Sequence, residues 1–81
     1  MKQWKKLWID ALRDEKNEQC FGNFFIGNKC CALGLLSKVL NQSYEDLPRE
    51  IRVFCSKLKI TKFNDHDRYS FQQIATIVEH G

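Results

Sequence analysis

The sequence has no long apolar run, a single proline and no large excess of charge of one sign. None of its stretches reaches the roughly 18 consecutive apolar residues that a membrane-spanning helix needs. Its first residues, MKQWKKLWIDALRDEK, contain neither an apolar segment nor a small-residue cleavage site, so they do not resemble a signal peptide. We therefore expect no association with a membrane and predict a cytoplasmic protein.

Paired metal ligands are also missing. There is no C-x-x-C motif, and His66 and His80 lie far along the chain from the adjacent Cys30 and Cys31, whereas structural zinc sites favour close ligand pairs. The polar segment 64–67 lacks the glycine and the terminal glutamate of a calcium loop. We expect no metal and no cofactor, and we expect the four cysteines to be reduced and mostly buried, because nothing indicates an oxidising compartment.

Charge is modest, with 13 basic and 10 acidic residues and a net charge of +3 with histidine neutral. A dedicated DNA-binding domain usually carries a stronger basic face. The densest basic stretch lies between residues 49 and 62 and contains Arg49, Arg52, Lys57, Lys59 and Lys62. This stretch is either a solvated helix face or a contact for an anionic partner, such as a nucleotide or an acidic protein surface.

Enough apolar surface is present for one small domain, with 43% hydrophobic and 12% aromatic residues in 81 positions. Apolar residues recur at helical spacing in four segments, residues 4–12, 31–40, 48–58 and 70–80. Ser70 and Gln73 form the sequence pattern of a capping box at the start of the last segment. Residues 60–69 are mainly polar and are predicted to form a loop.

The segment between the first two helices is typical of strands. Phenylalanine and isoleucine flank Gly27-Asn28, a two-residue turn signal, which predicts a short hairpin of residues 20–25 with 29–31. Gly34 lies inside the second helix at a cost of about 1 kcal/mol relative to alanine, which indicates close packing against the hairpin or another helix.

The expected fold is therefore α+β and mostly helical, with about four helices and one short β-hairpin between the first and second, in a single domain over residues 1–81. The residues that we expect in its core are Trp8, Leu12, Phe25, Leu33, Leu36, Leu40, Ile51, Phe54, Leu58, Ile74 and Val78.

Cys31 is the one candidate nucleophile with a structural argument. It lies where the hairpin meets the second helix, and a helix N-terminus lowers the pKa of a thiol and presents N–H groups to an oxyanion. Gln19 is a candidate donor, and His66, flanked by Asp65 and Asp67, is the candidate base. This set describes a small cysteine-dependent hydrolase, which is the alternative function.

A non-enzymatic binding protein is the preferred class. An enzyme needs a positioned base and a water-shielded pocket, and 81 residues leave little interior volume for one. A pocket at a homodimer interface would relieve that limit, so a homodimer stays open. Sequence-specific DNA binding is disfavoured, because the last segment is similar to the first helix of a helix-turn-helix but no recognition helix follows it.

An ordered series of motifs runs through the chain: W-x-x-A-L-R at residues 8–13, Gln19, C-A-L-G-L-L at 31–36, L-P at 47–48, N-D at 64–65 and S-F-Q-Q-I-A at 70–75. This series resembles a family of small proteins encoded by bacteriophages and prophages. Three positions depart from the family pattern, since Cys30 replaces an aromatic residue, Ser37 a frequent cysteine and Lys38 a frequent aspartate. The resemblance implies a phage accessory protein in the cytoplasm of an infected bacterial host.

We expect any ligand or partner site where Gln19, Cys31, Asn64 and Asp65 converge, with Trp8 at its floor. The start of a helix offers free N–H groups to an anion, and a glutamine is both donor and acceptor. The basic residues Arg49 and Arg52 are additional candidates. The expected partner is a host bacterial protein, such as a defence factor, or a small nucleotide-like anion. The competing interpretation is that these side chains only satisfy the backbone and shape turns.

Overall fold

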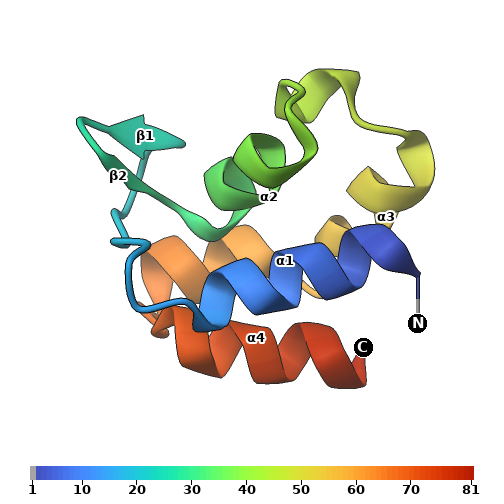
Figure 1. Cartoon of the computed structure of the whole chain (residues 1–81). Helices are drawn as coiled ribbons and strands as arrows, with labels where there is room; N and C mark the ends of the chain where they lie inside the picture. The colour runs from blue at the N-terminus through green and yellow to red at the C-terminus, as the bar shows by residue number, and fades with distance from the viewer. Residues whose placement is uncertain (1) are drawn as a thin grey trace.

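The computed structural model describes residues 2–81, and 61% of the chain is helical. The elements in chain order are α1 (Gln3–Arg13), β1 (Phe25–Ile26), β2 (Lys29–Cys30), α2 (Ala32–Leu40), η1 (Tyr44–Asp46), α3 (Arg49–Lys57), η2 (Lys62–His66) and α4 (Phe71–His80). The predicted α+β fold, mostly helical with a two-stranded antiparallel hairpin between the first two helices, is confirmed. Figure 1 shows α1 beside α4, with both chain ends on the same side of the molecule.

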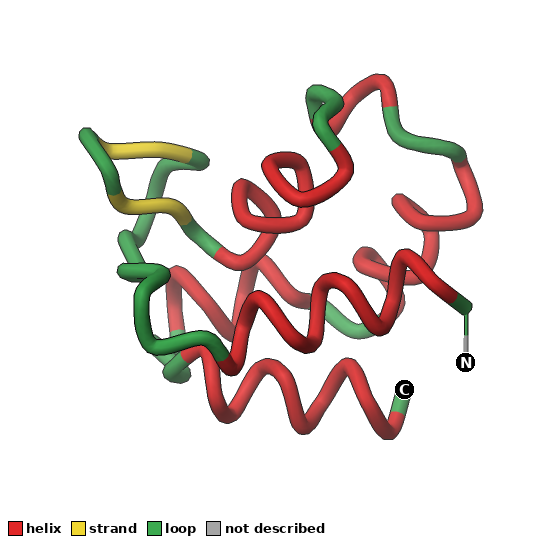
Figure 2. Tube along the Cα trace, viewed as in Figure 1, coloured by secondary structure: helices red, strands yellow, loops and turns green. Residues whose placement is uncertain are grey.

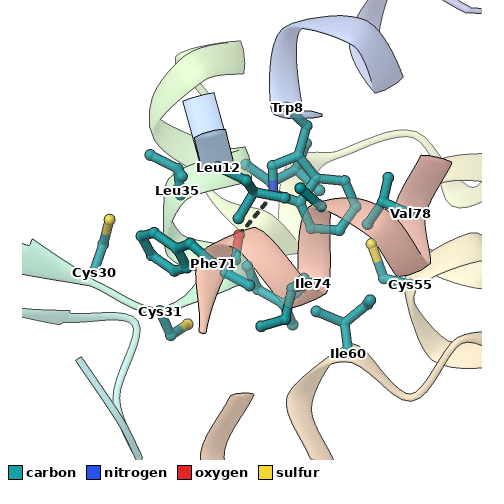
Figure 3. Packing of buried hydrophobic residues seen from close by; sticks show 14 of the residues in the cluster. Trp8, Leu12, Cys30, Cys31, Leu35, Cys55, Ile60, Phe71, Ile74 and Val78 are labelled. Carbon is teal, nitrogen blue, oxygen red and sulfur yellow. Dashed lines mark hydrogen bonds between the residues drawn. The ribbon is translucent and has the colours of Figure 1, made fainter. Parts of the chain in front are cut away.

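The core lies among α1, α2 and α4. Its fully buried large apolar side chains are Trp8, Leu12, Leu35, Leu36, Leu47, Ile60, Ile74 and Val78. Figure 3 shows several of them clustered in the interior with Trp8. The apolar stripes of α1 and α4 face each other, because each helix repeats its apolar residues every three to four positions. The indole Nε1 of Trp8 donates to the Ala32 carbonyl at 2.9 Å, which ties α1 to the start of α2.

The ends of the helices follow local chemistry. The predicted capping box is present, since the Ser70 hydroxyl accepts from the Gln73 amide and the Gln73 side chain accepts from the Ser70 amide. Asn41 ends α2 in the left-handed conformation, at φ 54°. α3 begins directly after Pro48, as the Leu47-Pro48 pair predicts.

The hairpin is shorter than predicted. β1 and β2 pair with Phe25 opposite Cys30 and Ile26 opposite Lys29, around the predicted Gly27-Asn28 turn. The first strand does not extend back to residue 20, because Gly22 has a φ of 83° and turns the chain away. Phe25 is also wrongly placed in the core, since it is 53% exposed. A Cβ on Gly34 would clash with the Phe24 carbonyl, so the close approach of the hairpin to α2 is the reason for glycine there.

The predicted loop over residues 60–69 is wrong for residues 60–66. A helical stretch over residues 60–66 includes the π-helical segment η2, which Figure 2 shows in red between α3 and α4. Lys59 and Arg68, both at positive φ, bound this stretch and separate it from its neighbours. The wide π turn, closed by the Asp67 amide on the Lys62 carbonyl at 2.9 Å, holds Asn64 inward where it is 1% exposed.

Among residues 2–81, no helix combines the length and the apolar character needed to cross a membrane.

Candidate functional site

Three of the predicted site residues form one hydrogen-bond network between the hairpin, α2 and η2. Gln19 Nε2 donates to Asn64 Oδ1 at 2.8 Å and to the Tyr69 carbonyl at 2.7 Å. Gln19 also bridges to Cys30 on the outer side of β2. Both donor positions of this amide are therefore used inside the protein, and they tie the hairpin to the segment before α4.

Asn64 is the centre of the network. Its Oδ1 accepts from the Ala32 amide at 3.1 Å as well as from Gln19, and its Nδ2 donates to the Cys20 carbonyl at 3.1 Å. Its Nδ2 also donates to Asp65 Oδ1 at 2.6 Å, and that oxygen accepts from the Gly22 amide at 2.9 Å. A buried amide with all its donors and acceptors occupied fixes three chain segments relative to one another.

Cys31 is the N-cap residue of α2, as the sequence predicts, but its thiol is not activated. Its Sγ accepts from the Gly34 amide at 3.3 Å, and the Ala32 amide is taken by Asn64. Burial raises the pKa of the Cys31 thiol, and this outweighs the lowering by the amides of Leu33 and Gly34. The expectations of a lowered thiol pKa and of free N–H groups at this helix end are wrong.

His66 is not placed to act as the base of a thiol enzyme. Its side chain is 80% exposed, and its Nδ1 lies 3.1 Å from Asp67 Oδ1. The contact with His66 and the neighbouring Lys62 ammonium lower the pKa of the Asp67 carboxyl. The imidazole therefore pairs with a surface carboxylate, and no contact links it to the buried thiol of Cys31.

Trp8 is a core residue and not the floor of a site. Its side chain is 0% exposed, and Figure 3 shows it enclosed by buried side chains, with its only marked bond running to the backbone of α2. A ligand cannot reach a ring that has no accessible surface. Three predicted site residues, Cys31, Asn64 and Asp65, do line one cavity, of about 300 Å³. The rest of its lining is formed by Gly22, Asn23, Phe24, Leu33 and Thr61.

A larger groove, of about 660 Å³, lies between the N-terminal part of α1 and the exposed side of α3. Trp4, Val53 and Phe54 form its apolar floor, and we call it the α1/α3 groove. Trp4 and Phe54 meet edge to face with ring centroids 5.3 Å apart. Of its lining residues, only Arg49 was predicted as a site residue. The sequence signals for it are Trp4, which precedes the buried part of the α1 stripe, and Val53, an apolar residue outside the predicted core.

The rim of the α1/α3 groove is mainly cationic: it contains Lys2, Lys5, Arg49, Glu50 and Lys57. The Lys5 ammonium lies 4.7 Å from the centre of the Phe54 ring, and Lys2 pairs with Glu50 at the edge of the groove. Glu50, the one carboxylate among the described residues of the rim, therefore already forms an ion pair with Lys2.

The basic stretch seen in the sequence does not form one patch. Only Arg49 and Lys57 line the α1/α3 groove. Arg52 Nε donates to the Leu47 carbonyl at 3.1 Å, and Lys62 pairs with Asp67 at 3.3 Å. Of the two candidate arginines, the structure therefore places Arg49 at a surface groove, whereas the Nε of Arg52 is used in holding the start of α3.

The hairpin presents a second apolar surface. Phe24, Phe25 and Ile26 are 45%, 53% and 49% exposed, and Phe24 stacks on Tyr44 with ring centroids 5.9 Å apart. A hollow of about 600 Å³ between the hairpin and the end of α2 includes Phe24, Phe25, Lys38 and Tyr44 in its lining. We call Phe24, Phe25 and Ile26 the hairpin face.

No metal site accompanies these surfaces, because within residues 2–81 no three histidine, cysteine or acidic side chains are grouped closely enough to hold an ion. All four cysteines are buried and unbridged. No family model, no curated protein and no solved structure matches the chain.

Proposed function

We propose that this chain is a small phage-encoded accessory protein that acts by binding, and that it inhibits a bacterial host factor by masking a protein surface. The observation that carries the proposal is the set of large apolar side chains left 39–53% exposed, which are Leu7, Phe24, Phe25, Ile26 and Val53. Three of these side chains are consecutive in the hairpin, and exposed apolar side chains that lie close together are typical of protein contact sites.

Catalysis is less well supported than binding. The thiol of Cys31 is 7% exposed and its pKa is raised, whereas a catalytic thiol needs access and a stabilised thiolate. The candidate base His66 is exposed to solvent, and its imidazole lies beside the carboxylate of Asp67. The alternative of a cysteine-dependent hydrolase therefore lacks both an activated nucleophile and a positioned base.

Masking of a protein surface is better supported than sequestration of a small anion. A small-ligand site is concave and encloses most of its ligand. The α1/α3 groove and the hollow beside the hairpin are open to solvent, and the start of α2 already gives its amides to Asn64 and Cys31. Broad, open apolar surfaces suit the side chains of another protein.

The test is affinity capture from a bacterial lysate, with native mass spectrometry on the same purified protein. The test variant carries Phe25→Thr and Ile26→Thr, which keep a β-favouring residue at each position. The control variant carries Glu15→Thr and Lys16→Thr on an exposed turn. We expect the parent and the control to retain the same bacterial protein at similar yield. We expect the hairpin variant, or a variant of the α1/α3 groove such as Arg49→Glu or Val53→Thr, to retain several-fold less.

Two results would contradict the proposal. One is the absence of any specifically retained protein, and the other is a small anion that remains bound in native mass spectra at one per chain. The same spectra give the subunit count and so decide whether the partner surface is a second copy of this chain.

A further inference from the structure

The floor of the α1/α3 groove is apolar and includes two packed aromatic rings. Trp4 is held between Phe54 and Trp8, at centroid distances of 5.3 Å and 6.4 Å. Val53, one position before Phe54 on α3, is 39% exposed. The Trp4 indole N–H is buried and has no acceptor among residues 2–81, although a buried donor is normally paired. The exposure of Val53 shows that part of the apolar floor is not covered by the interior of the domain.

The rim carries the whole net charge of the protein. Four basic side chains and one carboxylate surround the floor, and the chain has 13 basic and 10 acidic residues in total. Setting the five rim residues aside leaves nine of each sign, so the rest of the molecule is balanced. The Arg49, Val53 and Lys57 positions on α3 are four residues apart, which places one apolar residue between two cations along a single helix face.

We infer that the α1/α3 groove binds an acidic protein segment whose apolar side chains cover Val53 and Phe54 and whose carboxylates meet the cationic rim. This inference rests on the proposed function and names the chemistry of its partner. The apolar floor requires apolar side chains, and the rim excess of positive charge requires acidic neighbours around them.

Other anionic partners match the groove less well. A polynucleotide supplies a regular track of phosphates, but the cations here surround an apolar floor instead of following a line. A nucleotide would have to stack on a ring face, whereas Trp4 and Phe54 pack edge to face on each other at an interplanar angle of 79° and Lys5 covers the Phe54 ring. These ligands are used below as competing probes.

The experiment titrates the isotopically labelled protein with a designed helical peptide that has leucine on one face and glutamate on the flanks. A matched peptide has lysine in place of every glutamate. We expect the amide signals of Val53, Phe54 and Lys57 and the indole signal of Trp4 to shift with the acidic peptide only. We expect the affinity to fall at least about tenfold between about 0.01 M and 0.1 M salt, because the screening length shortens from about 30 Å to 10 Å.

Two variants and one control locate the effect. Arg49→Glu reverses one rim charge at the N-terminal end of α3, where a carboxylate suits the helix dipole, so the fold should be kept. Val53→Thr replaces a methyl group of the floor by a hydroxyl of similar shape. We expect each to weaken the acidic peptide about fivefold or more, and Lys16→Glu, an equal charge change on an exposed turn, to weaken it less than twofold.

The inference is overturned by equal binding of the lysine peptide, by shifts confined to the hairpin face, or by an equal loss with Lys16→Glu. It is also overturned where adenosine triphosphate, a DNA duplex or vesicles of anionic lipid displace the acidic peptide or bind the groove more tightly. In the lysate experiment, a partner that Arg49→Glu and Val53→Thr retain and the hairpin variant loses refutes the groove but leaves the proposed function intact. A parent that retains nothing refutes the proposed function.

Discussion

Replacing Asn64 should destabilise the fold far more than its place in a polar segment suggests. In Asn64→Leu the side chain keeps a similar size, but the Ala32 amide and the Cys20 carbonyl lose their partner. Each buried unsatisfied backbone group costs about 1–3 kcal/mol, and partial relaxation brings the expected total to about 2–4 kcal/mol. A domain of 81 residues has a free energy of unfolding of about 4–12 kcal/mol, so the loss is a large part of it.

The substitution Asn64→Asp separates the acceptor role of this side chain from its donor role. One carboxylate oxygen still accepts from Gln19 and Ala32, but the other faces the Cys20 carbonyl and the Asp65 carboxylate, where a donor is needed. Burial and the two acceptors raise the pKa of the introduced acid in the folded state above its unfolded value. The loss of stability is therefore full at neutral pH and shrinks as the pH falls through the folded pKa, because the protonated acid donates again.

The assay is urea unfolding followed by far-ultraviolet circular dichroism at pH 7 and pH 5, with the parent measured at both. Asn23→Asp makes the same chemical change at an exposed position and is expected to stay within about 0.5 kcal/mol of the parent. Two results would refute the reasoning. Either Asn64→Leu unfolds at the same urea concentration as the parent, or the deficit of Asn64→Asp is the same at both pH values.

Three further predictions concern the hairpin, the thiols and a helix cap. Gly34→Ala should lower the free energy of unfolding in urea by up to about 2 kcal/mol. The new methyl group gains about 1 kcal/mol in helix propensity, but its clash with the Phe24 carbonyl costs about 1–3 kcal/mol. A gain in stability would show that the hairpin does not pack on α2. Burial raises the pKa of the Cys31 thiol, and it raises that of Cys55 to about 12. Iodoacetamide at pH 7 should therefore label the folded chain far more slowly than the chain unfolded in urea, as measured by intact mass spectrometry. Rapid labelling of Cys31 in the folded chain at pH 6 would restore the hydrolase alternative. Ser70→Ala should lower the free energy of unfolding by about 1 kcal/mol through loss of the capping box, and no change in thermal midpoint would contradict the cap.

Local patterns in the sequence were enough to determine most of the elements. The apolar stripes predicted the four α-helices, the Gly27-Asn28 pair predicted the turn of the hairpin, and Ser70 with Gln73 predicted the cap of α4. These features depend on residues within about four positions of one another, through helical periodicity, turn geometry and side-chain caps. A single sequence shows such short-range relations directly.

Only the tertiary structure determined the roles of residues whose contacts lie far away in the sequence. The stretch 60–66 is helical although it is mainly polar, since Asn64 bonds to chain segments 32 and 44 residues away. A long-range bond also ties Gln19 to Asn64, whereas Cys31 caps α2 through a local bond, so both residues have structural roles. Cys31, Asn64 and Asp65 nevertheless line one cavity of about 300 Å³.

The cationic groove was likewise decided only by the fold, because the residues of α1 and α3 that build it are more than forty positions apart. Composition reports a net charge of +3, but the packing of two helices determines that this charge surrounds one apolar floor. The physical reason is that charge and apolar area act through space, and the spatial neighbours of a residue are set by the packing of its whole element.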